Sequence, residues 1–280
     1  MEKLKTIIVV LIAIIIVFII IMNIGKANFQ NEIQKNKEKI LASNLNINND
    51  TIKKEDLPDS VSKWLTKVGV FKSKRIKNIS LNQEGLMKLS QDQKEYYKPK
   101  AYQLVNVIEP GFLWTVDISM MPLINTKGMD FMYDGKGSMQ IKVAYIIPVV
   151  NEKPNKKINE STLSRYLLEL PWYPTAALES YMSWEKVTDH IAEATINYKG
   201  IETRAKFFFD EDFQLIKIEA LRYKELTEGA ERKKCIGEIK TYTKVDDLLI
   251  PDRIDVAWIE NDQKFTWYIV QANSFDINYY

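Results

Sequence analysis

Residues 112–121 read FLWTVDISMM and carry an apolar side chain at every second position. The alternating apolar set consists of Phe112, Trp114, Val116, Ile118 and Met120. Three of the positions between them are polar, namely Thr115, Asp117 and Ser119. Because successive side chains of a β-strand point to opposite faces, this alternation predicts a strand with one buried and one wet face. Such strands are typical of antiparallel sheets, so the stretch favours an antiparallel β fold.

The same period of two recurs from Arg75 to the C-terminus. The further candidate strands are residues 101–108, 125–133, 139–147, 192–198, 203–209, 215–223, 237–244, 253–259 and 264–272. Turn signals separate several of them, at Glu109-Pro110-Gly111, Asp134-Gly135, Lys199-Gly200 and Asp210-Glu211-Asp212. The pattern therefore predicts about ten strands in one antiparallel meander.

One helical insertion interrupts the meander. Residues 159–169 have helical spacing of apolar residues, Ser161 is the expected cap, and Pro171 ends the helix. Pro174 can begin a short second helix. Open sheets of this size tend to curl or split. We therefore expect a mainly β fold, a curved antiparallel sheet or half-barrel with the helices on its concave face. A closed barrel and a sandwich are the alternatives.

The folded domain is expected to begin near Leu57 and to extend over residues 57–280. Pro58 suits the first turn of a helix, and Gly69 suits its C-terminal stop. Residues 26–56 are rich in Asn and Lys and have one weak apolar stripe. This composition predicts a polar linker with a short frayed helix.

Residues 1–25 are predicted to be a transmembrane anchor. The run from Thr6 to Gly25 has no charge and is dominated by Ile, Val, Leu and Phe. At about 1.5 Å per residue it spans roughly the 30 Å of a bilayer's hydrocarbon core. We therefore expect a single-pass protein of the cell membrane, and cleavage as a secretory signal is the alternative.

The orientation of the domain is contested by lysines on both flanks of this run. Lys3 and Lys5 precede it, whereas Lys26 and three further lysines up to Lys39 follow it. Large domains translocate largely regardless of such charges, and the nearest flank favours a cytoplasmic N-terminus. We expect an extracytoplasmic domain.

The overall charge argues against a nucleic-acid partner. The chain has 39 Lys and Arg against 37 Asp and Glu, a net charge of +2. Phosphate backbones are bound by concentrated basic faces, which such a balance does not favour.

The residues that carry catalysis and metal binding are few. His190 is the one histidine and Cys235 the one cysteine, so multi-histidine metal sites and disulfides are excluded. We expect His190 in a turn or at a strand end and Cys235 as a buried filler. The methionines between Met120 and Met139 are predicted to serve in packing or cavity lining, with copper binding as the alternative. No cofactor, no metal and no catalytic residue is predicted.

Two arginines lie at positions where apolar residues are expected. On strand 215–223 the face predicted to carry Ile216, Ile218 and Ala220 continues to Arg222. Arg165 lies among the apolar residues of the inserted helix, with Glu160 and Glu169 as candidate partners. A charge directed at an apolar interior is costly unless it is paired. These arginines are either structural ion pairs at a rim or the cationic end of an apolar cavity.

Residues 163–176, LSRYLLELPWYPTA, resemble the signature of an uncharacterised bacterial family, a domain of unknown function. The resemblance extends from Leu57 to the C-terminus and includes Pro110-Gly111-Phe112, residues 133–139 and Ile250-Pro251. It supplies no activity. The fold that it implies is similar to the half-barrel of the outer-membrane lipoprotein carrier, with helices in the mouth of a curved sheet.

We hypothesise a membrane-anchored, non-enzymatic protein whose half-barrel cavity binds an apolar or lipid-like ligand. The predicted ligand-binding residues are Trp114, Arg165, Tyr166, Trp172, Tyr173, Arg222 and Trp258. The first alternative is a cell-envelope scaffold with a packed interior, and protein partners are not predicted. The second is a hydrolase, which requires two acids converging in one cleft with Arg165 or Arg222.

Overall fold

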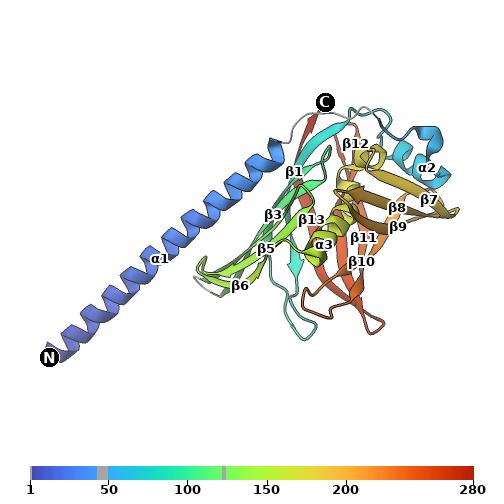
Figure 1. The fold of residues 1–280 in the computed structure, drawn as a ribbon. Coiled ribbons are helices and arrows are strands. Elements are labelled where there is room, and N and C mark those ends of the chain that lie inside the picture. The colour runs from blue at the N-terminus through green and yellow to red at the C-terminus, as the bar shows by residue number, and fades with distance from the viewer. Residues whose placement is uncertain (1, 43–49, 122–123) are drawn as a thin grey trace.

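The sheet is one continuous antiparallel array. The computed structural model describes residues 2–42, 50–121 and 124–280, and in this part of the chain thirteen strands pair in one sheet. Their spatial order is β6-β5-β4-β3-β2-β1-β13-β12-β11-β10-β9-β8-β7. Every pair is antiparallel, and the sheet curls around its interior (Figure 1). The predicted mainly β half-barrel is confirmed, and the sheet stays open between its edge strands β6 and β7.

The strands have the following bounds: β1 (Ile76–Met87), β2 (Lys100–Asn106), β3 (Gly111–Met121), β4 (Ile124–Tyr133), β5 (Lys136–Val143), β6 (Ile147–Glu152), β7 (Met182–Thr188), β8 (Ile191–Tyr198), β9 (Ile201–Phe209), β10 (Leu215–Tyr223), β11 (Arg232–Val245), β12 (Leu248–Glu260) and β13 (Gln263–Tyr279).

The helical insertion joins the two edges of the sheet. It consists of α3 (Lys156–Leu168) and the 3₁₀ turns η2 (Leu170–Trp172) and η3 (Pro174–Leu178). The chain leaves edge strand β6, crosses through these helices and re-enters the sheet at edge strand β7. On the way α3 contacts β9 and β10 on one side and β4 and β5 on the other, so it lies in the mouth of the half-barrel (Figure 1).

The helix begins earlier than the sequence indicates. Asn155 is its N-cap, because its side chain accepts hydrogen bonds from the backbone N–H groups of Lys157 and Ile158. The predicted cap, Ser161, lies inside the helix and is buried. Gly137 of β5 allows α3 to pack closely, because a Cβ at this position would lie 2.9 Å from the carbonyl oxygen of Ile158 and overlap Thr162.

Two strand predictions differ from the structure for local backbone reasons. The run 139–147 is divided into β5 and β6 by a turn in which Ala144 and Tyr145 have positive φ. In β10 a register shift against β9 between Leu215 and Lys217 leaves Ile216 exposed, although Ile218 remains buried. Such bulges bend a strand and increase the curvature of a sheet. Strands β1, β6 and β7 were not predicted as separate elements.

The principal core lies on the concave side and at the end closed by α2 (Asp59–Lys67). Trp64 of α2 is 1% exposed and packs against Phe207 and Phe209 of β9, with ring centroids 5.9 and 6.0 Å apart. Gly69 follows this helix with φ +90°, where its backbone approaches the carbonyl oxygen of Asp247. A residue with a Cβ would not fit there.

Helix α1 (Glu2–Leu41) is one uninterrupted helix. Its most apolar window has a mean hydropathy of 3.6, and among the described residues it is the one helix that is long and apolar enough to cross a membrane. It fits a single-pass anchor or a signal sequence. The predicted short frayed helix after Gly25 is wrong, because α1 continues to Leu41 without a break.

The second half of α1 packs on the outer face of the sheet, opposite α3 (Figure 1). Phe29 and Ile40 of α1 are 2% and 1% exposed. They pack against a second apolar cluster, whose buried sheet residues are Leu104, Leu113, Met129 and Phe131. This cluster explains why β3 has Leu113 on the face that also carries Thr115, Asp117 and Ser119.

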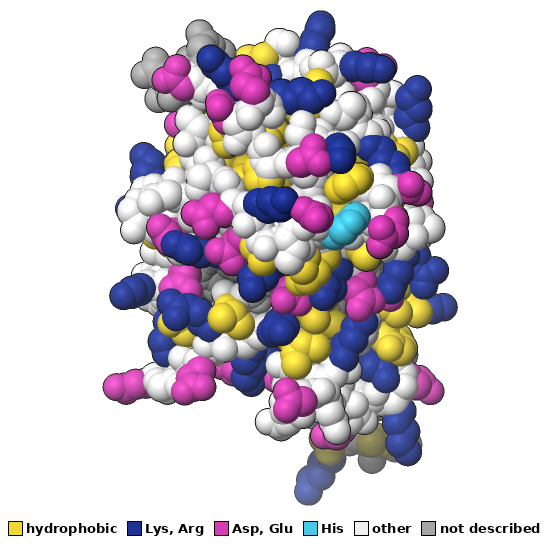
Figure 2. Space-filling view, turned by 90° about the vertical axis from the view of Figure 1, so that its right-hand side faces the viewer, with side chains coloured by type: hydrophobic (Ala, Val, Ile, Leu, Met, Phe, Trp, Pro, Cys, Tyr) yellow, Lys and Arg dark blue, Asp and Glu magenta, His cyan; other side chains and the backbone are white. Residues whose placement is uncertain are grey.

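Charges of both signs alternate over the β7–β10 side of the molecule (Figure 2). Arg204 of β9 pairs with Glu193 and Glu202, and Lys217 of β10 pairs with Glu219. The described residues on this face do not form a region of a single sign.

Candidate functional site

A cavity of about 400 Å³ lies between α3 and the concave face of the sheet. Its walls come from α3, from the β4–β6 side and from β10–β13 on the opposite side. Apolar side chains make up most of the lining, including Met139, Val150, Leu168, Ile254 and Val256. The volume falls within the range of small-molecule sites, which are largely apolar with a few placed polar groups.

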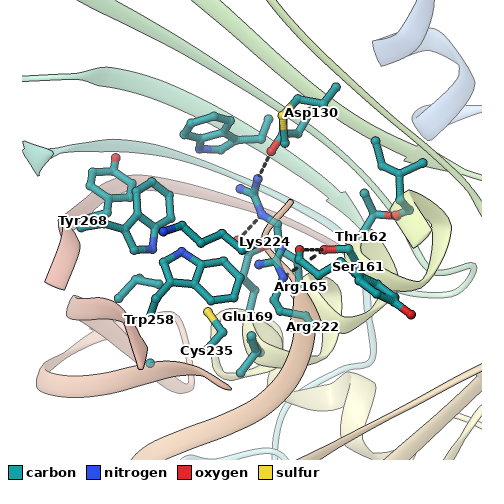
Figure 3. Close-up of a pocket in the computed structure, with 18 of the residues that line it drawn as sticks. Asp130, Ser161, Thr162, Arg165, Glu169, Arg222, Lys224, Cys235, Trp258 and Tyr268 are labelled. Atoms are coloured by element: carbon teal, nitrogen blue, oxygen red, sulfur yellow. Dashed lines mark hydrogen bonds and ion pairs between the residues drawn. The ribbon is translucent and has the colours of Figure 1, made fainter. Parts of the chain in front are cut away.

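Arg165 of α3 holds two carboxylates in the cavity wall (Figure 3). Its Nη1 donates to Asp130 Oδ2 at 2.6 Å, and its Nε donates to Glu169 Oε1 at 2.8 Å. The guanidinium also lies over the ring of Trp114, 4.8 Å from the centroid. Asp130 comes from β4 and Glu169 from the residue that follows α3, so the three charges tie the helix to the sheet.

Burial and pairing act in opposite directions on these groups. Burial opposes the charge of Arg165, but Glu169 and Asp130 outweigh it, so the pKa of Arg165 is raised. Burial raises the pKa of Asp130, and the cations of Arg165 and Arg222 oppose this rise without cancelling it. The predicted partner Glu169 is confirmed. Glu160, the other candidate, pairs with Arg232 instead.

Arg222 of β10 lies on the opposite wall and has no carboxylate partner within 4.0 Å among the described residues. Its Nε donates to Ser161 Oγ at 3.2 Å, and its guanidinium lies 5.4 Å from the ring centroid of Trp258. Burial lowers the pKa of Arg222, because the charged form is poorly solvated there. Arg222 is therefore a cation at the edge of an apolar space with hydrogen-bonding capacity left over.

Two further polar groups belong to this wall. Cys235 of β11 is 1% exposed, and burial raises the pKa of its thiol, which is the state of a filler rather than of a nucleophile. The indole N–H of Trp267 is buried and has no hydrogen-bond partner in the part of the chain that the structure describes. Lys224 also lines the cavity, although its ammonium pairs with Glu260 at 2.8 Å.

Five of the seven predicted ligand-binding residues line the cavity, namely Trp114, Arg165, Trp172, Arg222 and Trp258. Tyr166 and Tyr173 do not. Both are 0% exposed in the core, where the Tyr173 hydroxyl donates to the carbonyl oxygen of Tyr166 at 2.5 Å. Tyr166 follows Arg165 directly, so the helix directs it about 100° away from the cavity.

Three cavity-lining residues were not predicted from the sequence, namely Asp130, Lys224 and Trp267. Asp130 could have been predicted, because it is a charged residue between Gly128 and Met132 on the inward face of β4. Arg222 occupies a similar position after Ala220 on β10. In the sheet Asp130 is directly opposite Trp114. A charged residue on the inward face of a strand therefore indicates the site on both walls of the cavity, Asp130 on β4 and Arg222 on β10.

The remaining chemical candidates lie elsewhere. His190 is in the β7–β8 turn, where its Nδ1 lies 3.0 Å from the carbonyl oxygen of Asp210 and its ring stacks on Phe213. This agrees with the predicted turn position. Asp189 pairs with Lys186 at 2.6 Å instead of orienting the imidazole. Among the described residues no cluster of three His, Cys, Asp or Glu side chains is arranged for a metal ion.

Fold and site together define an open antiparallel half-barrel with an apolar, arginine-bearing cavity. The chain belongs to the DUF6920 family, a family of unknown function, whose model matches residues 55–277. The resemblance found in the sequence is thereby confirmed. A search of curated proteins found no match.

Two solved structures are similar over most of their length. A Vibrio parahaemolyticus domain named for outer membrane lipoprotein sorting has a TM-score of 0.45 and 9% identity, covering 80% of this chain and 93% of that one. A β-barrel-like protein of the DUF1849 family from Brucella abortus has a TM-score of 0.28 and 10% identity, covering 74% of this chain and 100% of that one. At these scores nothing about the ligand of this chain follows from either likeness.

Proposed function

We propose that the chain is a membrane-tethered, extracytoplasmic binding protein whose cavity holds an amphiphile with an apolar body and an anionic head group. The observation that carries this proposal is Arg222, a half-buried cation without a carboxylate partner among the described residues, at the wall of a cavity of about 400 Å³. A charge held largely away from water without a counter-ion is costly. An acidic ligand group would pair it, and the apolar lining would bury the rest of the ligand.

The two arginines have different roles in this proposal. The charge of Arg165 is balanced by Asp130 and Glu169, so Arg165 fixes the wall and supplies no free charge. Arg222 faces the same space with neutral partners, the Ser161 hydroxyl and the Cys235 thiol. The indole N–H of Trp267, which is buried without a partner among the described residues, offers a second donor to an acidic group.

The scaffold alternative requires a packed interior, which the lined cavity does not favour. The hydrolase alternative requires two acids in one cleft with an arginine, and Asp130 and Glu169 meet this condition at Arg165. Both carboxylates are engaged by that guanidinium, and Glu169 also accepts from Gln103 Nε2 at 2.6 Å. This engagement favours a structural role over proton transfer, so we place binding first.

The test is native mass spectrometry on a chain that begins at Lys26. This variant keeps the packed half of α1 and lacks the apolar run, so it is purified without detergent. We expect an adduct with the mass of an amphiphile, which organic extraction removes. An adduct-free mass in repeated preparations from membrane-containing lysate would contradict the proposal.

Arginine variants make the test specific. A hydrogen bond to a charged group contributes about 1.5–3 kcal/mol, so Arg222→Gln is expected to weaken binding of a long-chain fatty acid roughly 10- to 100-fold. Quenching of the wall tryptophans by a brominated fatty acid measures this affinity. Arg204→Gln, an exposed arginine on β9, is the matched control and should bind as the wild type does.

The same samples separate binding from hydrolysis. The wild type and Asp130→Asn are incubated with the bound ligand for increasing times before the ligand is extracted. If the protein were a hydrolase, products would accumulate in the wild type, whereas Asp130→Asn would keep the ligand intact. Identical intact ligand in the wild type and in Asp130→Asn supports binding without turnover.

A further inference from the structure

The turn between β5 and β6 lies against α1 at the end of its apolar run. A Cβ at Gly25 would lie 2.9 Å from the carbonyl oxygen of Tyr145, and the rings of Phe29 and Tyr145 make an edge contact at 6.2 Å. Gly25 is the last residue of the uncharged stretch. Because α1 is one helix from Glu2 to Leu41, this contact fixes the sheet tip at the level where the helix leaves the hydrocarbon core.

The side chains around this contact are those of a membrane interface. Tyr145 is held with φ 63°, an uncommon conformation for a bulky residue, and directs an aromatic side chain to α1. Aromatic belts of Tyr and Trp lie at the head-group level of membrane proteins. Ile147, at the start of β6, and Val149 are each 57% exposed, so this edge presents apolar surface next to the same level.

Lysines surround the contact. Lys127 Nζ lies 5.5 Å from the ring centroid of Tyr145, and Lys142 Nζ lies 5.3 Å from that of Phe29. Burial lowers the pKa of Lys127, and the charge of Lys26 contributes in the same direction, so these two cations are close. Lys127 pairs with Asp117, and a groove of about 310 Å³ between α1 and the sheet runs past Lys100, Lys127 and Tyr145.

We infer that Lys142, Tyr145 and Ile147, here termed the membrane collar, rest on the bilayer that α1 crosses, with Lys142 on an anionic phospholipid head group, whereas Lys127 stays paired with Asp117. This inference rests on the proposed spanning role of α1. It goes beyond cavity binding, because it assigns a second lipid contact outside the cavity.

The collar has a consequence for the cavity. Val150 of β6 lines the cavity and lies three residues beyond Ile147, about 10 Å along the strand. Edge strand β6 therefore connects the head-group level with the cavity wall.

The test uses the full chain in nanodiscs of phosphatidylcholine with phosphatidylglycerol. A nitroxide is attached at Ile147→Cys or, as a control, at Leu221→Cys on β10, which is equally exposed at 57%. The unsubstituted chain is the blank, because its thiol at Cys235 is buried. Collision rates with oxygen and with a water-soluble nickel chelate report the depth of each label.

We expect the label at 147 to collide at least threefold less with nickel chelate, relative to oxygen, than the label at 221. Equal accessibility at both positions, in chains that co-elute with nanodiscs, would overturn the collar and leave the anchor standing. Failure of the chain to co-elute with nanodiscs would overturn the anchor and the collar together. Cavity binding, measured on the chain from Lys26, is independent of both results.

The role of Lys142 is tested by lipid composition. We expect the label at 147 to lie deeper in discs with phosphatidylglycerol than in pure phosphatidylcholine, and Lys142→Gln to abolish this difference. Lys186→Gln, at an exposed lysine on β7, should retain it. A difference that persists in Lys142→Gln would overturn the assignment of this lysine to an anionic head group.

Discussion

Replacement of Arg165 by methionine removes the one cation that joins two carboxylates in the cavity wall. The arginine side chain is 12% exposed, and those of Asp130 and Glu169 are each 15% exposed. Methionine has a similar length and no charge, so the packing against Trp114 is largely kept. The variant therefore isolates the electrostatic role of Arg165 from its bulk.

The expected cost follows from this geometry. Two charge-assisted hydrogen bonds, at 2.6 and 2.8 Å, are lost, and two poorly solvated carboxylates are left without their cation. Breaking a buried ion pair by removing one partner costs about 3–5 kcal/mol. With an m-value of about 3 kcal/mol/M for a domain of this size, the urea midpoint should fall by about 1–1.7 M.

The pH dependence gives a second, independent readout. The pKa of Asp130 in the folded chain is raised above its ordinary 3.8 by burial. Its contribution to stability is therefore fully present below pH 3.8 and is lost as pH rises through the folded value. Arg165→Met raises this pKa further, so the difference in stability between variant and wild type should grow from pH 4 to pH 8.

The assay is urea unfolding of the detergent-solubilised full chain, followed by tryptophan fluorescence. Arg204→Met, at an exposed arginine that also pairs with a glutamate, is the control and should change stability by less than about 0.5 kcal/mol. A loss below about 1 kcal/mol for Arg165→Met, or a loss independent of pH, would refute a buried ionic link between α3 and the sheet.

Two further substitutions test the packing of the helices. Phe29→Ala should destabilise the full chain by roughly 3–5 kcal/mol in the same urea assay, because it removes the aromatic contact of α1 with the sheet. Leu41→Ala, at an exposed position of the same helix, should change stability by less than about 0.5 kcal/mol. Equal effects of the two substitutions would show that α1 is not docked. Gly137→Ala should lower the free energy of unfolding by about 1–3 kcal/mol, because the added Cβ overlaps Thr162. Gly237→Ala is the control and should be tolerated, because its added Cβ meets nothing closer than 3.8 Å. A tolerated Gly137→Ala would contradict the close approach of α3 to β5.

Much of the sheet was predictable because its periodicity is local. Strand β10 was predicted with its observed bounds, Leu215–Tyr223, and β3 and β8 to within one residue at each end. The run 139–147 was predicted as one strand because alternation continues through Ala144 and Tyr145. Positive φ at these positions is not visible in the residue types, since neither is glycine.

Five lining residues of the site were predicted, the two arginines because a charge interrupted an apolar face and three tryptophans as aromatic lining. The criterion of an inward charge, applied to β4, also selects Asp130. The sequence could not separate Tyr166 and Tyr173, which fill the core, from Trp172, which borders the cavity. All three are aromatic residues of one helical segment, and only the packing of that segment decides which of them meets empty space.

Most of the strands, the apolar run of α1 and the inward arginines follow from the sequence alone, because each is a pattern among neighbours along the chain. Tertiary structure decided that Arg165 is neutralised and Arg222 is not, since Asp130 reaches Arg165 from a strand 35 residues away. It also decided that the lysine-rich segment after Gly25 is a docked helix. The apolar stripe of residues 26–41 indicates a face to be buried, but the surface that covers it comes from β2, β3 and β4, which lie far along the chain.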